Sequence, residues 1–501
     1  MTNSSLNDAW TALTSLDVAP LGDLFAGDEG RVARWTRTVS GITFDLAKTH
    51  LDAPLAEGFA GVAKAAGYAA RRDALFAGEI VNASEGRAAT HLAERGQGGA
   101  DDNDFAAMCH ARMRSLVDAI EGGAFGEIDA ILHIGIGGSA LGPDLVIDAL
   151  GRDADRYDVR VLANIDGEAF DEAVTGLDPA ATLVVGVSKT FTTIETLTNI
   201  DAAIEWLREG GVEDPHGQLI AVTAAPDAAL AYGIDETRIL PFGEGVGGRY
   251  SLWSTVGLSI ALALGWGAYE ELLEGAGEMD RHVRHADDNV ALTAAFADLL
   301  YAQLEGAETR AVFAYDERLR LLPDYLQQLE MESNGKSATA DGQPLARKSA
   351  PITWGGVGTD AQHAVFQLLH QGTHLVPVEF VAVIENEDSL DPRHHALLLG
   401  NCFAQGAALM AGKKSDDAAR SYAGNRPSMT TLLDRLDART LGALLAFYEH
   451  RTFANAVLIG INPFDQFGVE LGKEMAKKLD DEAGRASLDP STRALIEKAG
   501  L

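Results

Sequence analysis

Cysteine is almost absent from this 501-residue sequence: only Cys109 and Cys402 occur, far apart and outside any C-x-x-C or Cys/His spacing. Disulfide frameworks and structural zinc sites both need several cysteines at short, regular spacings. The sequence therefore argues against both and fits a reducing compartment, so we expect a cytoplasmic protein.

Basic residues are scarce compared with acidic ones, with 40 Lys and Arg against 74 Asp and Glu and a net charge of −34. Nucleic acids and anionic membrane surfaces are polyanions that proteins hold with Lys and Arg. We therefore expect no nucleic-acid partner and no membrane partner. A phosphorylated substrate would have to be held by short-range cations and N–H donors, because the overall field repels it.

Long apolar runs are also missing. The first residues, 1–5, lack the basic and apolar regions of a secretory signal, so we expect no secretion. Residues 251–268 carry no charge and are just long enough to be tested as a membrane span. Glycines and hydroxyl side chains dilute their hydrophobicity, which favours a helix buried between protein layers.

Length and pattern predict at least two α/β domains, because single hydrophobic cores stop growing near ~250–300 residues. Residues 1–120 have Ala, Leu and acidic residues at helical spacing and are predicted to form a helical lead-in. Short apolar runs then alternate with helical segments, which is typical of parallel sheets covered on both faces. Strands are expected at 130–136, 159–163, 182–187, 219–223 and 238–242, then at 311–315, 351–354, 375–384 and 457–461. A charged helix from Gly468 and an exposed tail beyond about residue 480 are expected to end the chain.

Three motifs follow strands of the first series, where doubly wound sheets bind ligands. The glycine turn at 135–142 lets backbone approach a ligand; its spacing also fits a loose dinucleotide fingerprint, or simply close helix–strand packing. Residues 188–196 gather hydroxyls and Lys189 at a helix start, which favours a phosphate cradle over a simple helix cap. Arg249 beside two glycines could stabilise an anion or merely satisfy a helix end.

The second series offers candidate proton carriers. Residues 327–336 contain Glu330 and Glu332, either of which could be a base or an ordinary solvated carboxylate. His363, followed by His370 and His374, superficially resembles paired metal ligands. We predict no metal site, because a Gly-Thr pair breaks the helical spacing and no H-E-x-x-H arrangement is present.

Near the chain's end, Gln466 and Lys473 are polar groups at the start of the last predicted helix. The alternative explanation is helix capping for Gln466 and solvent exposure for Lys473.

Taken together, these segments resemble the glucose-6-phosphate isomerase family, in the family's order over nearly the whole chain. The matching segments are 76–82 with Glu85 and Arg87, 135–142, 164–167, 188–196, 246–257, 327–336, 358–373 and 464–473. The resemblance implies an α/β fold of two doubly wound, SIS-type αβα sandwich domains with mostly parallel sheets, a helical N-terminal lead-in and a C-terminal helix. The implied parts are a lead-in at 1–120 packing on the second domain, SIS domains at 121–285 and 286–480, and a tail at 481–501.

The resemblance also implies the activity and the roles of individual residues. The chain would be a cofactor-free aldose-ketose isomerase, active as a homodimer on a sugar phosphate. Glu332 would be the base and Arg249 the anion stabiliser, while His363, from the neighbouring subunit, and Lys473 would open the sugar ring. The residues implied in substrate binding are Ser188, Lys189, Thr190 and Thr193 for the phosphate, Gly138 and Ser139 near the sugar, and Gln328 and Gln466 as hydrogen-bonding groups.

The chemistry of these side chains agrees with the implied roles. Moving a proton between C1 and C2 through a cis-enediol(ate) needs one ionised carboxylate, and Glu has a reference pKa of ~4.3. A fixed cation stabilises the enediolate charge, and an imidazole with a reference pKa of ~6.5 suits ring opening. The chain departs from the commonest family pattern at Ala140, Ile194, Asp360, Ala361 and Phe467, none of them a proposed proton carrier. The changes at Ala140 and Asp360 leave substrate preference and pH optimum open.

Two other functions fit parts of the sequence. A non-catalytic sugar-phosphate sensor with SIS domains would keep the phosphate loop but would not need the base, the arginine and the ring-opening pair. A nucleotide-dependent oxidoreductase would use the glycine turn and would need a ribose-binding acid after the second strand, for which Asp166 is the only candidate.

Overall fold

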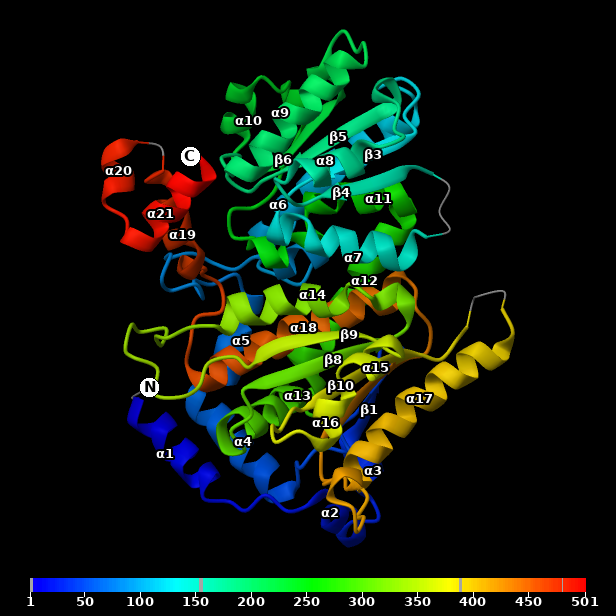
Figure 1. Ribbon diagram of the computed structural model, residues 1–501, viewed down its shortest axis with the longest axis vertical. Helices are drawn as coiled ribbons and strands as arrows, with labels where there is room; N and C mark the ends of the chain where they lie inside the picture. Colours follow the sequence, from blue (N-terminus) through cyan, green and yellow to red (C-terminus); the bar gives the residue numbers. More distant parts are fainter. Residues whose placement is uncertain (1–2, 153–155, 387–389, 480) are drawn as a thin grey trace. The chain divides into compact units, whose positions relative to one another are not determined.

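The computed structural model describes residues 3–152, 156–386, 390–479 and 481–501 (Figure 1). Its contacts divide the chain into a large compact unit, Met1–Pro463, and a small one, Phe464–Leu501. The small unit consists of helices: α19 (Glu470–Lys477), which begins near the predicted position, α20 (Glu482–Ala486) and α21 (Pro490–Ala499). The large unit contains both sheets.

The first sheet has five parallel strands in the order β4-β3-β5-β6-β7. They are β3 (Ala130–Ile134), β4 (Asp158–Leu162), β5 (Thr182–Val187), β6 (Leu219–Thr223) and β7 (Ile239–Pro241). Side chains of α8 (Gly167–Val174), α9 (Ile194–Glu209) and α10 (Pro226–Tyr232) pack on one face. The strand order reverses between β3 and β5, so the loops after these two strands flank the crevice where such sheets bind ligands.

The second sheet has six strands in the order β1-β2-β11-β10-β8-β9. They are β1 (Thr36–Val39), β2 (Ile42–Asp45), β8 (Thr309–Tyr315), β9 (Ile352–Val357), β10 (Val378–Val383) and β11 (Ser428–Leu433). The four strands β8 to β11 are parallel and repeat the order of the first sheet, with β9 on one side of β8 and β10 on the other. The prediction of two doubly wound α/β layers with mostly parallel sheets is confirmed. The predicted domain boundaries stay predictions.

The lead-in is not wholly helical, because β1 and β2 form a hairpin within it. Ser40 and Gly41 connect the strands, with φ of 50° and 73°, as a two-residue turn of two left-handed residues requires. Ile42 and Phe44 are fully buried, and β2 pairs antiparallel with β11. The predicted helical lead-in thus contains one hairpin as well as helices, and the hairpin takes its stability from a strand almost 400 residues away in sequence.

The prediction of a strand at 457–461 is wrong. Its first residues form the last turn of α18 (Ala438–Ile459), a helix buried on all sides, and Gly460 ends that helix with a φ of 84°. A short apolar run reads the same in a buried strand and in a buried helix. The Thr-containing strand β11 was not predicted, whereas the other predicted strands all overlap β3 to β10.

The uncharged segment at 251–268 is buried as predicted over residues 251–263, but it is not one helix. It passes through η6 (Gly248–Trp253), η7 (Thr255–Gly257) and α11 (Leu258–Leu264) before α12 (Trp266–His285) begins. Within the described ranges, no helix combines the length and apolar character that a membrane crossing requires.

Candidate active site

The loop after β5 presents hydroxyl groups at the start of α9. Ser188 and Thr193 place their side-chain oxygens 3.1 Å apart, and those of Thr190 and Thr192 lie 2.8 Å apart. Thr193 stands at the N-cap of α9, yet its side chain makes no capping hydrogen bond. In each pair one hydroxyl donates to the other, which leaves the second hydrogen to donate to an anion, and the missing cap bond favours the phosphate cradle over the simple cap.

Lys189 joins this loop to the loop after β7. Its Nζ donates to the backbone carbonyls of Glu244 at 2.7 Å and Val246 at 2.9 Å. Burial, with the nearby Arg87 guanidinium, lowers the pKa of Lys189 to about 8. Arg87 also donates to the Glu244 carbonyl and pairs with Glu85 at 2.7 Å. Two basic side chains thus meet at the Glu244 carbonyl beside the loop after β5, with the Glu85 carboxylate paired to one of them.

The glycine turn after β3 serves a close backbone contact. A Cβ at Gly138 would lie 2.1 Å from the carbonyl carbon of Gly248, so only glycine fits between the turn and the residue before Arg249. The His133 ring links the turn to α11 by two hydrogen bonds. Its Nε2 lies 2.7 Å from the Ser139 carbonyl oxygen, and its Nδ1 lies 2.8 Å from the Ser259 hydroxyl. Burial lowers the pKa of His133 to about 4, so the imidazole is neutral near pH 7.

Arg249 and Glu332 face one another across the two halves of the large unit. Arg249 follows β7, its side chain is only 2% exposed, and its Nε donates to the Ser333 hydroxyl at 2.6 Å. The guanidinium also donates to the Pro463 carbonyl. One terminal nitrogen lies 3.5 Å from Glu332 Oε1, and the Glu332 side chain is 21% exposed. An accessible carboxylate thus stands beside a buried, immobilised cation.

Gln328 belongs to the same cluster. It lies on η10 (Gln327–Glu332), one turn before Glu332. A Cβ at Gly137 would lie 2.9 Å from Gln328 Nε2. The glycine turn, Arg249, Gln328 and Glu332 therefore come together, although they are distant in sequence.

Glu330, the other candidate base, is fully engaged elsewhere. Its Oε2 accepts from Arg310 Nε at 3.0 Å and from the Thr353 hydroxyl at 2.6 Å. Arg310 continues to Glu379 at 2.8 Å, and Glu379 also pairs with Arg451 at 2.6 Å. These bonds leave Glu330 a structural role and favour Glu332 as the base.

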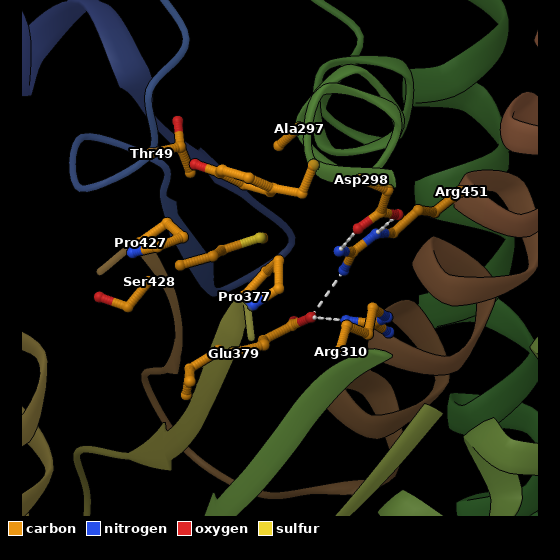
Figure 2. A pocket seen from close by; sticks show the side chains of 12 residues that line it. Thr49, Ala297, Asp298, Arg310, Pro377, Glu379, Pro427, Ser428 and Arg451 are labelled. Carbon is orange, nitrogen blue, oxygen red and sulfur yellow. Dashed lines mark hydrogen bonds and ion pairs between the residues drawn. The ribbon is translucent and has the colours of Figure 1, made fainter. Parts of the chain in front are cut away.

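Figure 2 shows the part of this network formed by Arg310, Glu379 and Arg451 beside a cavity of about 20 Å³, with Arg451 between Asp298 and Glu379. Burial alone would raise the pKa of Glu379, but the guanidinium groups of Arg451 and Arg310 outweigh it and lower the pKa to about 2. A cavity this small has room for about one water molecule. The network is therefore a set of buried ion pairs next to the second sheet, and the cavity beside it is too small to hold a sugar phosphate.

One predicted site residue, His363, is not joined to this cluster. His363 lies on α15 (Asp360–Ala364) and is exposed, with no hydrogen bond or ion pair to any described residue. Gln466 and Lys473 belong to the small unit, which is described by itself. No group of three His, Cys, Asp or Glu side chains within the described ranges is arranged to hold a metal ion.

Comparison with known proteins places this geometry in a family. The phosphoglucose isomerase family profile matches residues 45–496. The chain belongs to the phosphoglucose isomerase family. It is 63% identical to the glucose-6-phosphate isomerase of Rhizorhabdus wittichii, with 98% of both chains covered, and 62% identical to that of Sphingopyxis alaskensis, with 98% of this chain and 99% of the other covered. A crystal structure of a glucose-6-phosphate isomerase from Chlamydia trachomatis superposes with a TM-score of 0.89 at 30% identity, covering 98% of each chain.

Within this phosphoglucose isomerase fold, sequence reasoning overlooked the residues that hold Arg249. Ser333 directly follows Glu332, and Tyr250 directly follows Arg249; both hydroxyls are buried and lie 2.9 Å apart. The only signal in the sequence was that each hydroxyl residue is adjacent to a proposed catalytic group. Tyr250 and Ser333 are 83 residues apart in sequence, so only the fold brings their hydroxyls together.

Proposed function

We propose that this chain interconverts glucose 6-phosphate and fructose 6-phosphate by opening the sugar ring and moving a proton between C1 and C2. The observation that carries the proposal is the 3.5 Å approach of the Arg249 guanidinium to Oε1 of a partly exposed Glu332, beside the loops at the switch point. Relatives that are 63% and 62% identical over nearly their full lengths bear the name of this activity.

Glu332 acts as the base. Its carboxylate takes the proton from C2 of the open-chain aldose and returns it to C1, and the reverse path uses the same group. A positioned general base of this kind contributes roughly 10²–10⁴-fold to the rate. Arg249 stabilises the negative charge that develops on the enediolate oxygens, and its fixed position means that it needs no reorganisation during the reaction.

The substrate is held by its phosphate at the start of α9. The Ser188, Thr190 and Thr193 hydroxyls and the Lys189 ammonium supply donors there, and unpaired N–H groups of the first helical turn add to them. Gly138, Ser139 and Gln328 lie on the sugar side of this cradle.

Ring opening completes the mechanism. His363 and Lys473 transfer protons at the anomeric hydroxyl and ring oxygen, and Gln466 hydrogen-bonds the substrate, as the family resemblance implies. His363 is exposed on the single chain, which suits a residue supplied to the site of a second copy in a homodimer. The enzyme works in the cytoplasm on a free sugar phosphate, without a cofactor.

Incubation of the pure protein with fructose 6-phosphate in deuterated water tests the function. We expect glucose 6-phosphate to form with deuterium at C2, because a carboxylate exchanges its captured proton with solvent. Failure to form any aldose phosphate would reject the isomerase function and would favour the non-catalytic sensor, which binds sugar phosphates without converting them.

A pH profile tests the phosphate cradle. Because the folded-state pKa of Lys189 is about 8, the free enzyme loses this positive charge as the pH rises through 8. We expect kcat/KM, which reports the free enzyme's ionisations, to fall above that pH mainly through a higher KM. Lys189→Arg keeps its charge throughout and should show no such decline between about pH 7.5 and 9.5. Identical profiles for the two proteins would contradict a phosphate contact by Lys189.

A further inference from the structure

A second cavity, of about 840 Å³, lies at the other edge of the first sheet from the candidate active site. Its walls come from α6 (Ala100–Glu121) and the loop after it, from η4 (Pro215–Gln218) and from η5 (Glu236–Arg238). Because η4 and η5 directly precede β6 and β7, the cavity stands at the amino-terminal ends of these strands, whereas the catalytic loops follow carboxyl ends. The five residues of β6 separate the two edges by roughly 15 Å. A ligand here would not overlap a sugar phosphate.

The size and the mixed lining of this cavity suit a small organic molecule. Small-molecule sites usually enclose roughly 300–1,000 Å³ and combine apolar walls with a few polar groups. Leu116, which is 8% exposed, and Ala119 line the cavity from α6, and Phe125 lines it from the following loop. The cavity therefore offers an apolar surface next to the charged groups of η4 and η5.

Three charged side chains of the lining have no partner among the residues that the structure describes. Arg238, Asp214 and Glu236 make no side-chain hydrogen bond or ion pair there, and the Arg238 Nε is buried without an acceptor. A buried N–H without an acceptor costs free energy. Charges of both signs thus border one cavity without pairing with one another, which leaves them to a ligand that carries both signs.

Two further polar residues of the lining are held in place. Arg112 donates to the backbone carbonyl of Glu236, which ties α6 to η5. Gln218 Nε2 donates to the carbonyls of Pro179 at 2.8 Å and Thr182 at 2.6 Å. Both amide hydrogens of Gln218 are used in this way, so it can offer a ligand only its oxygen, which accepts hydrogen bonds.

We propose that this cavity binds a small zwitterion with an apolar side chain, of the α-amino acid class. Its carboxylate would pair with Arg238, its ammonium group with Asp214 and the Gln218 oxygen, and its side chain would lie on Leu116 and Phe125. A simple anion is repelled by the net charge of −34, and a simple cation leaves Arg238 without a partner. A zwitterion avoids both costs. The proposal does not depend on the isomerase function.

Calorimetric titration with L-phenylalanine and L-leucine tests the proposed site. We expect saturable binding with one site per chain. 3-Phenylpropionate lacks the ammonium group and 2-phenylethylamine lacks the carboxylate, so each should bind at least about tenfold more weakly than L-phenylalanine. Saturating glucitol 6-phosphate, which has no carbonyl group to react, should leave the affinity for L-phenylalanine unchanged.

Arg238→Gln and Asp214→Asn each remove one charge from the lining and should weaken L-phenylalanine binding by about tenfold. Neither side chain has a partner among the described residues, so melting followed by circular dichroism should stay close to wild type. Arg114→Gln is the matched control, because Arg114 lies on α6 and pairs with Asp118 at 3.1 Å outside the cavity lining.

Four results would overturn the proposal. They are the absence of saturable binding with both amino acids, equal affinity for 3-phenylpropionate, equal affinity in Arg238→Gln and Arg114→Gln, and displacement of L-phenylalanine by glucitol 6-phosphate. None of these measurements depends on turnover, so a failure of this proposal is distinct from a failure of the isomerase function.

Discussion

Glu332→Gln is expected to lower kcat for fructose 6-phosphate by roughly 10²–10⁴-fold, the usual contribution of a positioned general base. The amide has nearly the shape of the carboxylate but cannot accept the C2 proton. The side chain is partly exposed and makes one long contact to Arg249, so the fold should be little affected. Steady-state kinetics in a coupled assay and calorimetric titration with a non-reacting sugar phosphate would measure turnover and binding separately, and we expect affinity within a few-fold of wild type.

Glu330→Gln is the matched control two residues away. The substitution removes the negative charge of a buried side chain that accepts hydrogen bonds from Arg310 and Thr353. Its main effect should therefore be a lower melting temperature. The molecules that remain folded should turn over near the wild-type rate. If Glu330→Gln abolished turnover in a stably folded protein while Glu332→Gln did not, the assignment of the base would be reversed.

Arg95→Met is expected to destabilise the protein by about 3–5 kcal/mol, the range found when one partner of a buried ion pair is removed. Arg95 donates to both carboxylate oxygens of Asp280, at 2.8 and 2.9 Å, and to Glu449 at 2.6 Å, and all three side chains are at most 1% exposed. Its loss would leave two acids in the core without their cation. Chemical unfolding monitored by circular dichroism would measure the change.

Arg114→Met provides the comparison for an exposed ion pair. Arg114 pairs with Asp118 one helical turn away, and both side chains are about half exposed. Such pairs contribute about 0–1 kcal/mol, so this variant should unfold close to wild type. Equal losses in Arg95→Met and Arg114→Met would show that the buried network does not hold the core together.

The buried network joins the lead-in to two long helices of the large unit. Arg95 comes from the N-terminal segment, Asp280 from α12 and Glu449 from α18, and Glu449 also accepts from the Trp253 indole at 2.7 Å. Composition gave no sign of these contacts. A polar side chain in an Ala-rich helical pattern is ordinarily solvent-exposed, and only tertiary packing makes it internal.

The sequence by itself determined the parallel strands and the loops that follow them. Runs such as 182–187 and 219–223 are apolar except for one terminal threonine each, as strands buried on both faces usually are, and their ends were predicted to the residue. The glycine turn and the hydroxyl-rich loop were recognisable for the same reason, since each directly follows such a strand.

Only the tertiary structure decided between groups with identical local chemistry. Glu330 and Glu332 lie two residues apart in one short segment, yet one is bound by Arg310 and the other faces Arg249. The hairpin at 36–45 likewise became part of a sheet only because β11 offered an unpaired edge. Residue type and spacing fix what a side chain can do. Its role depends on which distant groups the fold brings within a few ångströms, because hydrogen bonds and close ion pairs form only over that range.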